Sequence, residues 1–397
     1  MHILHVVGAR PNFMKAAPVL RALNAHSGVR QTLVHTGQHY DPTMSDVFFR
    51  QLEMPQPDCN LEVGSGSHAQ QTAAVMQAFE PVLLERQPDL VLVYGDVNST
   101  VAAALVCSKL GVRVGHVEAG LRSWDRSMPE EINRLLTDQL SNFLFTPSAD
   151  GDDNLLREGV DSSKIHLVGN AMIDTLVRLL PCAEEHFPPN VSQPYALVTL
   201  HRPSNVDDLP WLGDLLATLA DLSGDLNVIF PVHPRTRQRL DGLGVVPPAH
   251  VATGASPVPR SEASGTSSGP GSTSALITPS TPRLRLLEPL PYLEFLALQQ
   301  HAAMVITDSG GIQEETTFLA VPCLTVRENT ERPITITHGT NQLIGRDLTR
   351  LRIAAEQILK RSLTQKDRQE SGKPCIPLWD GHAAERIAQI IVRGSSQ

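Results

Sequence analysis

Short apolar runs alternate with longer amphipathic segments along most of the chain. The apolar runs predict buried strands, and the longer segments repeat apolar positions at helical spacing. In the first half the predicted strands are residues 2–7, 32–36, 90–94, 112–117, 143–146 and 165–168, and the predicted helices are 14–23, 44–52, 70–86, 100–110, 130–140 and 152–158. Because buried strands separated by helices pair in parallel, this half predicts a doubly wound, Rossmann-like domain.

The second half repeats the same alternation after a proline-containing link, residues 181–194. Its predicted strands are 195–200, 227–230, 284–287, 304–307 and 323–326, and its predicted helices are 212–222, 236–243, 292–299 and 312–318. We therefore expect two Rossmann-like domains, residues 1–180 and 195–375, with ligands bound in the cleft beyond the carboxyl ends of their strands. Residues 376–397 carry an amphipathic pattern over 383–392 and predict a C-terminal helix that packs on the domains.

One segment breaks this alternation. Residues 251–282 consist almost entirely of Ser, Thr, Gly, Ala, Pro and Val, and Arg260 and Glu262 are their only charges. Such a composition cannot bury enough apolar surface to offset the entropy of ordering it. Since strand–helix alternation resumes directly afterwards, we expect a disordered surface loop inserted in the second domain.

Length, charge and cysteine content narrow the class of protein. A chain of 397 residues suits two domains, and a formal net charge of −9 argues against a nucleic-acid or anionic membrane partner. The five cysteines show no C-x-x-C spacing, which predicts reduced thiols rather than disulfides or a zinc site. The chain opens on a predicted strand without a signal-peptide pattern, and no apolar run reaches the roughly 20 residues of a membrane span. We expect a cytoplasmic protein.

A Ser-Gly-Gly turn is the candidate anion site. Ser309, Gly310 and Gly311 follow an apolar run and open a predicted helix, where unpaired backbone N–H groups and the positive end of the helix meet. Glycines leave room for a close approach, so the expected ligand is a phosphate or diphosphate. Glu315, one turn further along, is placed to accept the two hydroxyls of a ribose. The alternative is that the glycines only allow a tight turn.

Three acids are candidates for proton transfer. Asp96 and Glu118 each follow a very apolar strand, where a carboxylate is costly unless it is paired or used. Glu130 opens a predicted helix after Pro129, and a favourable interaction with the helix dipole would by itself explain an acid there.

Cations and histidines lie at other predicted strand ends. Arg10 and Lys15 follow the first strand, His201 and His233 follow two strands of the second domain, and Arg332 comes shortly after the last predicted one. Most such cations are solvated surface charges, but two histidines facing the same edge as three acids favour a functional site. Together the residues suggest proton transfer on a diphosphate ester. No Walker loop, nucleophile elbow, nicotinamide fingerprint or metal-ligand cluster is present, so we expect neither a cofactor nor a metal.

Seven motifs occur in one order along the chain: Gly-Ala-Arg-Pro, Gly-Asp-Val-Asn-Ser-Thr, Gly-His-Val-Glu-Ala-Gly-Leu-Arg, Pro-Glu-Glu-Ile-Asn-Arg, His-Arg-Pro, Asp-Ser-Gly-Gly-Ile-Gln-Glu-Glu and Thr-Glu-Arg-Pro. Each is modest alone, but the ordered set is specific. The chain resembles the non-hydrolysing UDP-N-acetylglucosamine 2-epimerases from Met1 to the final helix, apart from the insert.

This resemblance implies a glycosyltransferase-B architecture, a homodimer, and reversible conversion of UDP-N-acetylglucosamine (UDP-GlcNAc) to UDP-N-acetylmannosamine (UDP-ManNAc) without a nicotinamide. In such enzymes UDP is eliminated to give 2-acetamidoglucal and is then re-added. By motif, the resemblance assigns catalysis to Asp96, Glu118, Glu130 and His201, with Lys15 near the reacting sugar. It assigns UDP contacts to Arg10, His233, Phe295, Ser309, Gly310, Gly311, Glu315 and Arg332. Which acid removes and which returns the C2 proton stays open.

Two departures from the family pattern leave alternatives open. Residues 40–45 differ from the pattern with which allosteric bacterial members contact a second UDP-GlcNAc, and Ile334 stands where many members have an acid. The alternatives are a 2-epimerase for a UDP-GlcNAc derivative carrying a 3-amino or uronic-acid group, a hydrolysing 2-epimerase, a glycosyltransferase of the same architecture, and a nucleotide-sugar-binding module without activity.

Overall fold

Two parallel sheets organise the molecule. The computed structural model describes residues 1–38, 49–224, 226–242, 283–360 and 376–394, so the predicted insert, residues 251–282, and most of the predicted helix 44–52 lie outside the described residues. The first sheet has seven strands in the order β3 (Cys59–Asn60), β2 (Arg30–His35), β1 (His2–Val7), β4 (Leu90–Tyr94), β5 (Val114–Val117), β6 (Phe143–Thr146) and β7 (Ile165–Leu167). Short β3 was not predicted, because two residues carry too little pattern.

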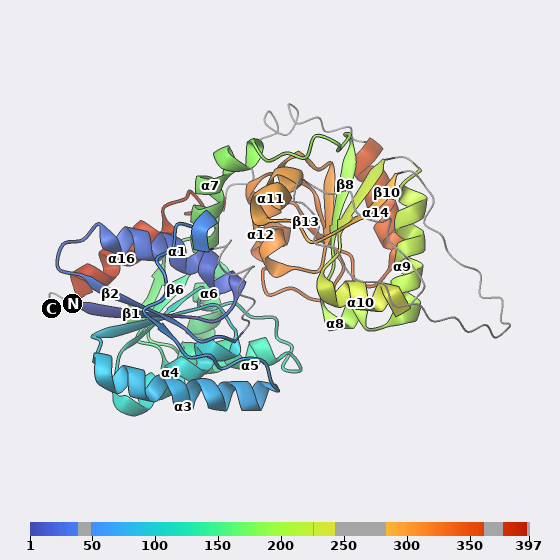
Figure 1. Ribbon diagram of the computed structural model, residues 1–397. Helices are drawn as coiled ribbons and strands as arrows, with labels where there is room; N and C mark the ends of the chain where they lie inside the picture. Colours follow the sequence, from blue (N-terminus) through green and yellow to red (C-terminus); the bar gives the residue numbers. More distant parts are fainter. Residues whose placement is uncertain (39–48, 225, 243–282, 361–375, 395–397) are drawn as a thin grey trace, which may run out of the picture.

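Helices cover both faces of this sheet (Figure 1). One face packs against α3 (His68–Arg86) and α4 (Asn98–Leu110), beside which lies α5 (Pro129–Leu140). The other packs against α1 (Arg10–Asn24), α7 (Ala171–Glu184) and α16 (Ala383–Gly394). The helix α6 (Ala149–Arg157) contacts β6 and β7 at one end of the sheet.

The second sheet has six strands in the order β10 (Leu284–Leu287), β9 (Asn227–Pro231), β8 (Tyr195–Thr199), β11 (Met304–Thr307), β12 (Cys323–Thr325) and β13 (Asn341–Leu343). One face packs against α9 (Leu209–Leu222) and α14 (Leu348–Lys360), and the other against α11 (Tyr292–His301) and α12 (Gly310–Phe318). The remaining helices are α8 (Pro203–Val206), α10 (Pro234–Gly242) and α13 (Ile334–Thr337). Neither β13 nor α14 was predicted.

Both sheets are parallel throughout, with the strand order of a doubly wound fold, which confirms the predicted fold class. The order reverses between β1 and β4 in the first sheet and between β8 and β11 in the second. Ligands of such sheets bind at these reversal points. No helix in the described ranges combines the length and the apolar character that crossing a membrane requires.

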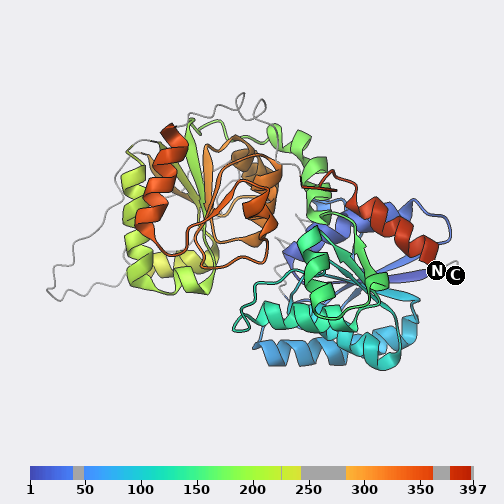
Figure 2. The same ribbon diagram turned by 180° about the vertical axis from the view of Figure 1, so that it is seen from behind.

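The helix α7 joins the two domains. It packs against α1 in the first domain and against α11 and α12 in the second (Figures 1 and 2). Pro181, the first residue of the predicted proline-containing link, lies inside α7, which continues to Glu184. The helix that contains this proline is thus the same one that packs on both domains.

The C-terminal helix α16 returns to the first domain. Ile387 and Ile391 are buried with residues of α1 and α7, and the backbone N–H groups of Ala383 and Ala384 donate to Asp174 of α7 at 3.1 and 2.7 Å. Asp174 therefore satisfies the unpaired N–H groups at the start of α16. The proposed boundaries at residues 180, 195, 375 and 376 stay predictions.

Shortening a side chain on the buried face of α16 should destabilise the first domain. We expect Ile387→Ala to lower the free energy of unfolding by about 2–4 kcal/mol, because it removes three carbons from a fully buried side chain. Urea unfolding would measure this loss. The matched control is Ile353→Ala on α14, whose side chain is 50% exposed and whose truncation should cost less than about 0.5 kcal/mol. Equal losses in the two variants would contradict the docking of α16.

Candidate active site

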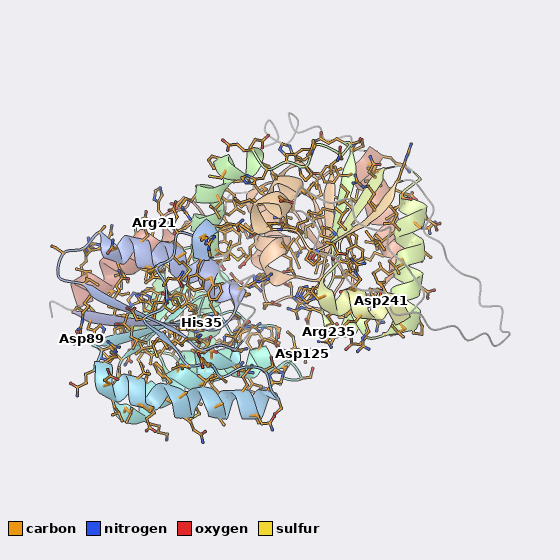
Figure 3. All side chains as sticks on the ribbon, viewed as in Figure 1. Arg21, His35, Asp89, Asp125, Arg235 and Asp241 are labelled. Atoms are coloured by element: carbon orange, nitrogen blue, oxygen red, sulfur yellow. The ribbon has the colours of Figure 1, made fainter. Side chains whose placement is uncertain are left out.

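The candidate residues lie at the carboxyl ends of strands in both domains. Asp96 follows β4 and Glu118 follows β5, while His201 follows β8 and Ser309 follows β11. Both strand-order reversals therefore carry candidate residues. Contacts between the domains confirm that the two strand edges face each other: the Asn329 amide, for example, donates to Asp125 at 3.4 Å (Figure 3 labels Asp125 on the first domain).

Glu118 lies between a cation from each domain. Lys15 of α1 donates to its Oε2, and Arg332 of the second domain donates from Nη2 to its Oε1 at 3.0 Å. All three side chains are buried. A carboxylate in such a position is stabilised only by close, well-aligned partners, and here it has one from each side.

The backbone of Glu118 is strained. Its φ is +76°, in the left-handed region that costs a non-glycine residue about 1–2 kcal/mol. Beside it, Gly95 has φ +61°, and a Cβ there would lie 3.0 Å from Lys15 Nζ and 3.1 Å from Glu118 Oε2. Gly95 therefore leaves the space in which the Lys15–Glu118 pair forms. Strain of this kind is typical of functional sites.

Asp96 is held by Arg134 of α5. Its Oδ2 accepts from Arg134 Nε at 3.0 Å and Nη2 at 2.7 Å. Burial alone would raise the pKa of the Asp96 carboxyl, but Arg134, Lys15 and Arg332 together lower it below its usual value. The result is a carboxylate that stays ionised beside three cations.

Glu130 and Glu131 are adjacent but differ in burial and in hydrogen bonding. Glu131 is buried and accepts from the backbone N–H of Ser123 and Trp124, both at 2.9 Å, and from Arg134 at 2.5 Å. Glu130 is half-buried, and within the described ranges no hydrogen bond or ion pair joins it to the other acids. It precedes Arg134 by four residues, so it lies on the same helix face as the group that holds Asp96.

Arg332 occupies the Ser-Gly-Gly turn. A Cβ on Gly310 would lie 2.2 Å from Arg332 Nη1, so the glycine admits the guanidinium at the start of α12. Arg332 also meets Glu314 at 2.9 Å and Glu331 at 2.5 Å. Burial alone would lower the pKa of Arg332, but these carboxylates and Glu118 raise it well above its usual value. The predicted anion turn is thus a helix start supplemented by a permanently charged guanidinium.

His201 contacts a buried acid, Asp308. Its Nδ1 is 3.1 Å from Asp308, which also accepts from the backbone N–H of His201 and Arg202. Its ring centroid is 5.7 Å from that of His233. Burial is the largest cause that lowers the pKa of His233, followed by the charges of His201 and Arg10. Since Arg10 belongs to the first domain, its charge reaches across the junction.

Glu315 and Phe295 lie further along α12 and α11. The Tyr292 hydroxyl donates to Glu315 at 2.8 Å, and burial raises the pKa of this carboxyl to about 7. Phe295 is half-buried and packs against the apolar cluster beneath α11. Within the described ranges no hydrogen bond or ion pair joins either residue to the acids of the first domain, so they form a separate part of the candidate site.

The arrangement can move protons and neutralise a dianion. Asp96 and Glu118 are ionised or paired acids, while Lys15, Arg332 and the start of α12 supply positive charge. Within the described residues no group of His, Cys, Asp and Glu could hold a metal ion. Sequence reasoning did not assign Arg134, Glu331 or Asp308, although each lies inside a quoted motif. Glu331 and Asp308 directly precede the assigned Arg332 and Ser309, and Arg134 follows the assigned Glu130 by four residues.

Nearly the whole chain matches known proteins in sequence. A family model for UDP-N-acetylglucosamine 2-epimerases matches residues 21–392. The chain belongs to this family. A Methanococcus maripaludis protein named UDP-N-acetylglucosamine 2-epimerase is 38% identical over 395 residues, covering 97% of each chain. A Pseudomonas aeruginosa protein named UDP-2,3-diacetamido-2,3-dideoxy-D-glucuronate 2-epimerase is 36% identical and covers 99% of this chain and 100% of that protein.

A solved structure of the family has the same fold. The Methanocaldococcus jannaschii UDP-GlcNAc 2-epimerase, crystallised in complex with UDP-GlcNAc and UDP, superimposes with a TM-score of 0.82 at 38% identity, covering 99% of this chain and 100% of that chain. The two-domain architecture expected from the resemblance is therefore confirmed for this family member. The roles of individual residues stay predictions.

The buried acid Glu331 should carry much of the stability of the junction. It meets Arg332 at 2.5 Å, Arg327 at 2.8 Å and Arg134 of the first domain at 3.9 Å. We expect Glu331→Gln to cost about 3–5 kcal/mol at pH 7, because it leaves buried cations without their counterion. Urea unfolding would measure the loss. The control, Glu356→Gln on α14, removes a half-exposed partner of Lys360 and should cost less than about 0.5 kcal/mol.

The free energy of unfolding that Glu331 contributes should also depend on pH. Burial alone would raise the pKa of Glu331, but its arginines hold it well below the usual 4.5. A depressed folded pKa means that the stabilisation is present above about pH 4.5 and is lost as the pH falls further. The difference in free energy of unfolding between wild type and Glu331→Gln should therefore shrink on acidification. A difference that stays constant with pH would contradict the lowered pKa of Glu331.

Proposed function

We propose that this protein interconverts UDP-GlcNAc and UDP-ManNAc by eliminating UDP to 2-acetamidoglucal and re-adding it, without hydrolysis. One observation carries the proposal: Glu118, at a strand end of the first domain, is paired with Arg332, at the glycine turn of the second. This contact brings acid–base groups and an anion-binding turn to one place. A reaction that removes a proton from C2 while a diphosphate leaves C1 needs an acid–base group at C2 and an anion-binding group beside C1.

Departure of UDP needs charge stabilisation on the diphosphate. We assign this role to Arg332 and the N–H groups at the start of α12 in the second domain and to Arg10 in the first. To His201, which contacts Asp308, we assign stabilisation of the departing phosphate or binding of the glucal. Glu315 and Phe295 are assigned to the nucleoside end, away from the acids.

Inversion at C2 needs proton transfer on both faces of the ring. A single base returns the proton to the face from which it came, so at least two groups must take part. Asp96, Glu118 and Glu130 supply these groups from the first domain, and Lys15 lies beside Glu118. The roles of base and acid are left shared among the three.

Proton exchange would test the reaction directly. With UDP-GlcNAc in heavy water, we expect UDP-ManNAc to appear with deuterium at C2, followed by proton NMR. Bound UDP should be re-added, so free N-acetylmannosamine should not accumulate. Epimerisation that retains the original C2 proton would refute elimination, and release of free N-acetylmannosamine with UDP would assign the protein to the hydrolysing class.

The adjacent acids of α5 offer a second test. We expect Glu130→Gln to lower kcat by about 10²–10⁴-fold, as for loss of a general acid or base, with little change in stability. Glu131→Gln should instead lower stability by about 1–3 kcal/mol, because it weakens a buried carboxylate with backbone and arginine partners. Rates at saturating UDP-GlcNAc and urea unfolding would separate the effects. If Glu130→Gln keeps full activity, Glu130 does not transfer protons.

A modified sugar is the second candidate substrate. It is favoured by the Pseudomonas aeruginosa relative, which covers the whole chain and whose name specifies a UDP-diacetamido-glucuronate. The two substrates differ by an acetamido group at C3 and a carboxylate at C6. Measuring kcat/KM for both, with product analysis by anion exchange, would identify the preferred sugar. A homodimer and a cytoplasmic location remain predictions from the resemblance and the composition.

A further inference from the structure

His116 is a buried histidine that the proposed reaction does not use. It lies in β5, two residues before Glu118, and is fully buried. Its Nδ1 is 2.6 Å from Asp138 Oδ1, and its Nε2 is 2.8 Å from the carbonyl oxygen of Gly95. Both partners accept hydrogen bonds when Asp138 is ionised. Only a ring that carries a proton on each nitrogen can donate to both.

The surroundings keep Asp138 ionised. Its Oδ2 is 2.7 Å from Arg122 Nη1 and accepts from the backbone N–H of Gly120 at 3.1 Å. Burial alone would raise the pKa of Asp138, but His116 and Arg122 lower it. Arg122 in turn donates to both oxygens of Glu158, at 2.7 and 2.6 Å. With an imidazolium at His116, two cations and two anions balance in this buried cluster.

The ring links the three segments that bear the candidate acids. Through Gly95 it fixes the backbone directly before Asp96, where φ is +61°. Through Asp138 it fixes α5, the helix of Glu130 and of the guanidinium that holds Asp96. Its own strand, β5, ends at Val117, directly before Glu118. A shift of the ring would therefore move all three carboxylates relative to one another.

We propose that His116, as a doubly protonated imidazolium, is a positioning residue that sets the spacing of Asp96, Glu118 and Glu130. It acts through these groups and touches no reacting atom. The inference rests on the proposed function, because the spacing matters only if these acids exchange protons at one carbon. A misplacement of about 1 Å in such a constellation can cost about 10²-fold in rate.

The variant His116→Gln removes the second donor, since a side-chain amide presents one nitrogen and one oxygen. Its matched control is His5→Gln. His5 is also fully buried in a strand of this sheet, but its Nδ1 bonds the Tyr94 hydroxyl at 2.7 Å, and burial lowers its pKa to about 3, so its ring is neutral. Both variants lose a buried ring, and only His116→Gln loses the link between the acids.

We expect His116→Gln to lower kcat and C2 deuterium exchange about 10²-fold, while the Kd for UDP, measured by calorimetry, changes less than about twofold. His5→Gln should keep kcat within a few-fold despite any loss of stability. Wild-type kcat in His116→Gln, or an equal loss in both variants, overturns the inference. Absence of epimerisation in the wild-type enzyme would instead overturn the proposed function and, with it, the role given to His116.

A measurement on the unmodified protein keeps the inference testable if His116→Gln does not fold. In protein with ¹⁵N-labelled histidine, the His116 ring should show protons on both nitrogens at pH 7. A neutral His116 ring with one protonated nitrogen would overturn the proposal. The His5 ring, neutral in the same spectrum, is the internal reference.

Discussion

The ion pair between Glu118 and Arg332 is the contact on which the geometry of the candidate site depends. Each partner is buried and sits among other charges, and the backbone of Glu118 is strained. Separating the pair would leave a desolvated acid on one domain and a desolvated guanidinium on the other, which costs several kcal/mol. The charges therefore define the separation of the two sheet edges, and the strain at Glu118 is tolerated because it aims a carboxylate at this meeting point.

The sequence predicted the parts of the fold that depend on local pattern. Five-residue apolar runs such as residues 90–94 can only be buried strands in a chain of this composition, and β4 has the predicted bounds. Asp96 and Glu118 were predicted as strand-end acids because an ionised group after such a run needs a partner or a use. The expected reaction came from the family resemblance, because hydrophobic periodicity predicts fold but not chemistry.

The sequence did not show which of two adjacent acids is buried. Glu130 and Glu131 are equivalent by type and by position in the first helical turn, yet only Glu131 turns inward to the 123–124 backbone. Likewise the Ser-Gly-Gly turn predicted an anion site, but it could not show that Arg332, over twenty residues later, fills the space above Gly310. Such outcomes depend on contacts between distant segments. The same holds for Pro181, which lies inside a helix that packs on both domains although an internal proline usually disfavours a helix.

The position of α16 has a consequence for how the protein forms during synthesis. The first domain contains its seven strands early in the chain, but part of its apolar face is covered by residues 383–394. The second sheet is continuous in sequence, from β8 to β13, and can close before α16 has been made. On the ribosome the domain translated first is therefore completed last, and until then its exposed α1–α7 surface is the part of the nascent chain most open to chaperones and to aggregation.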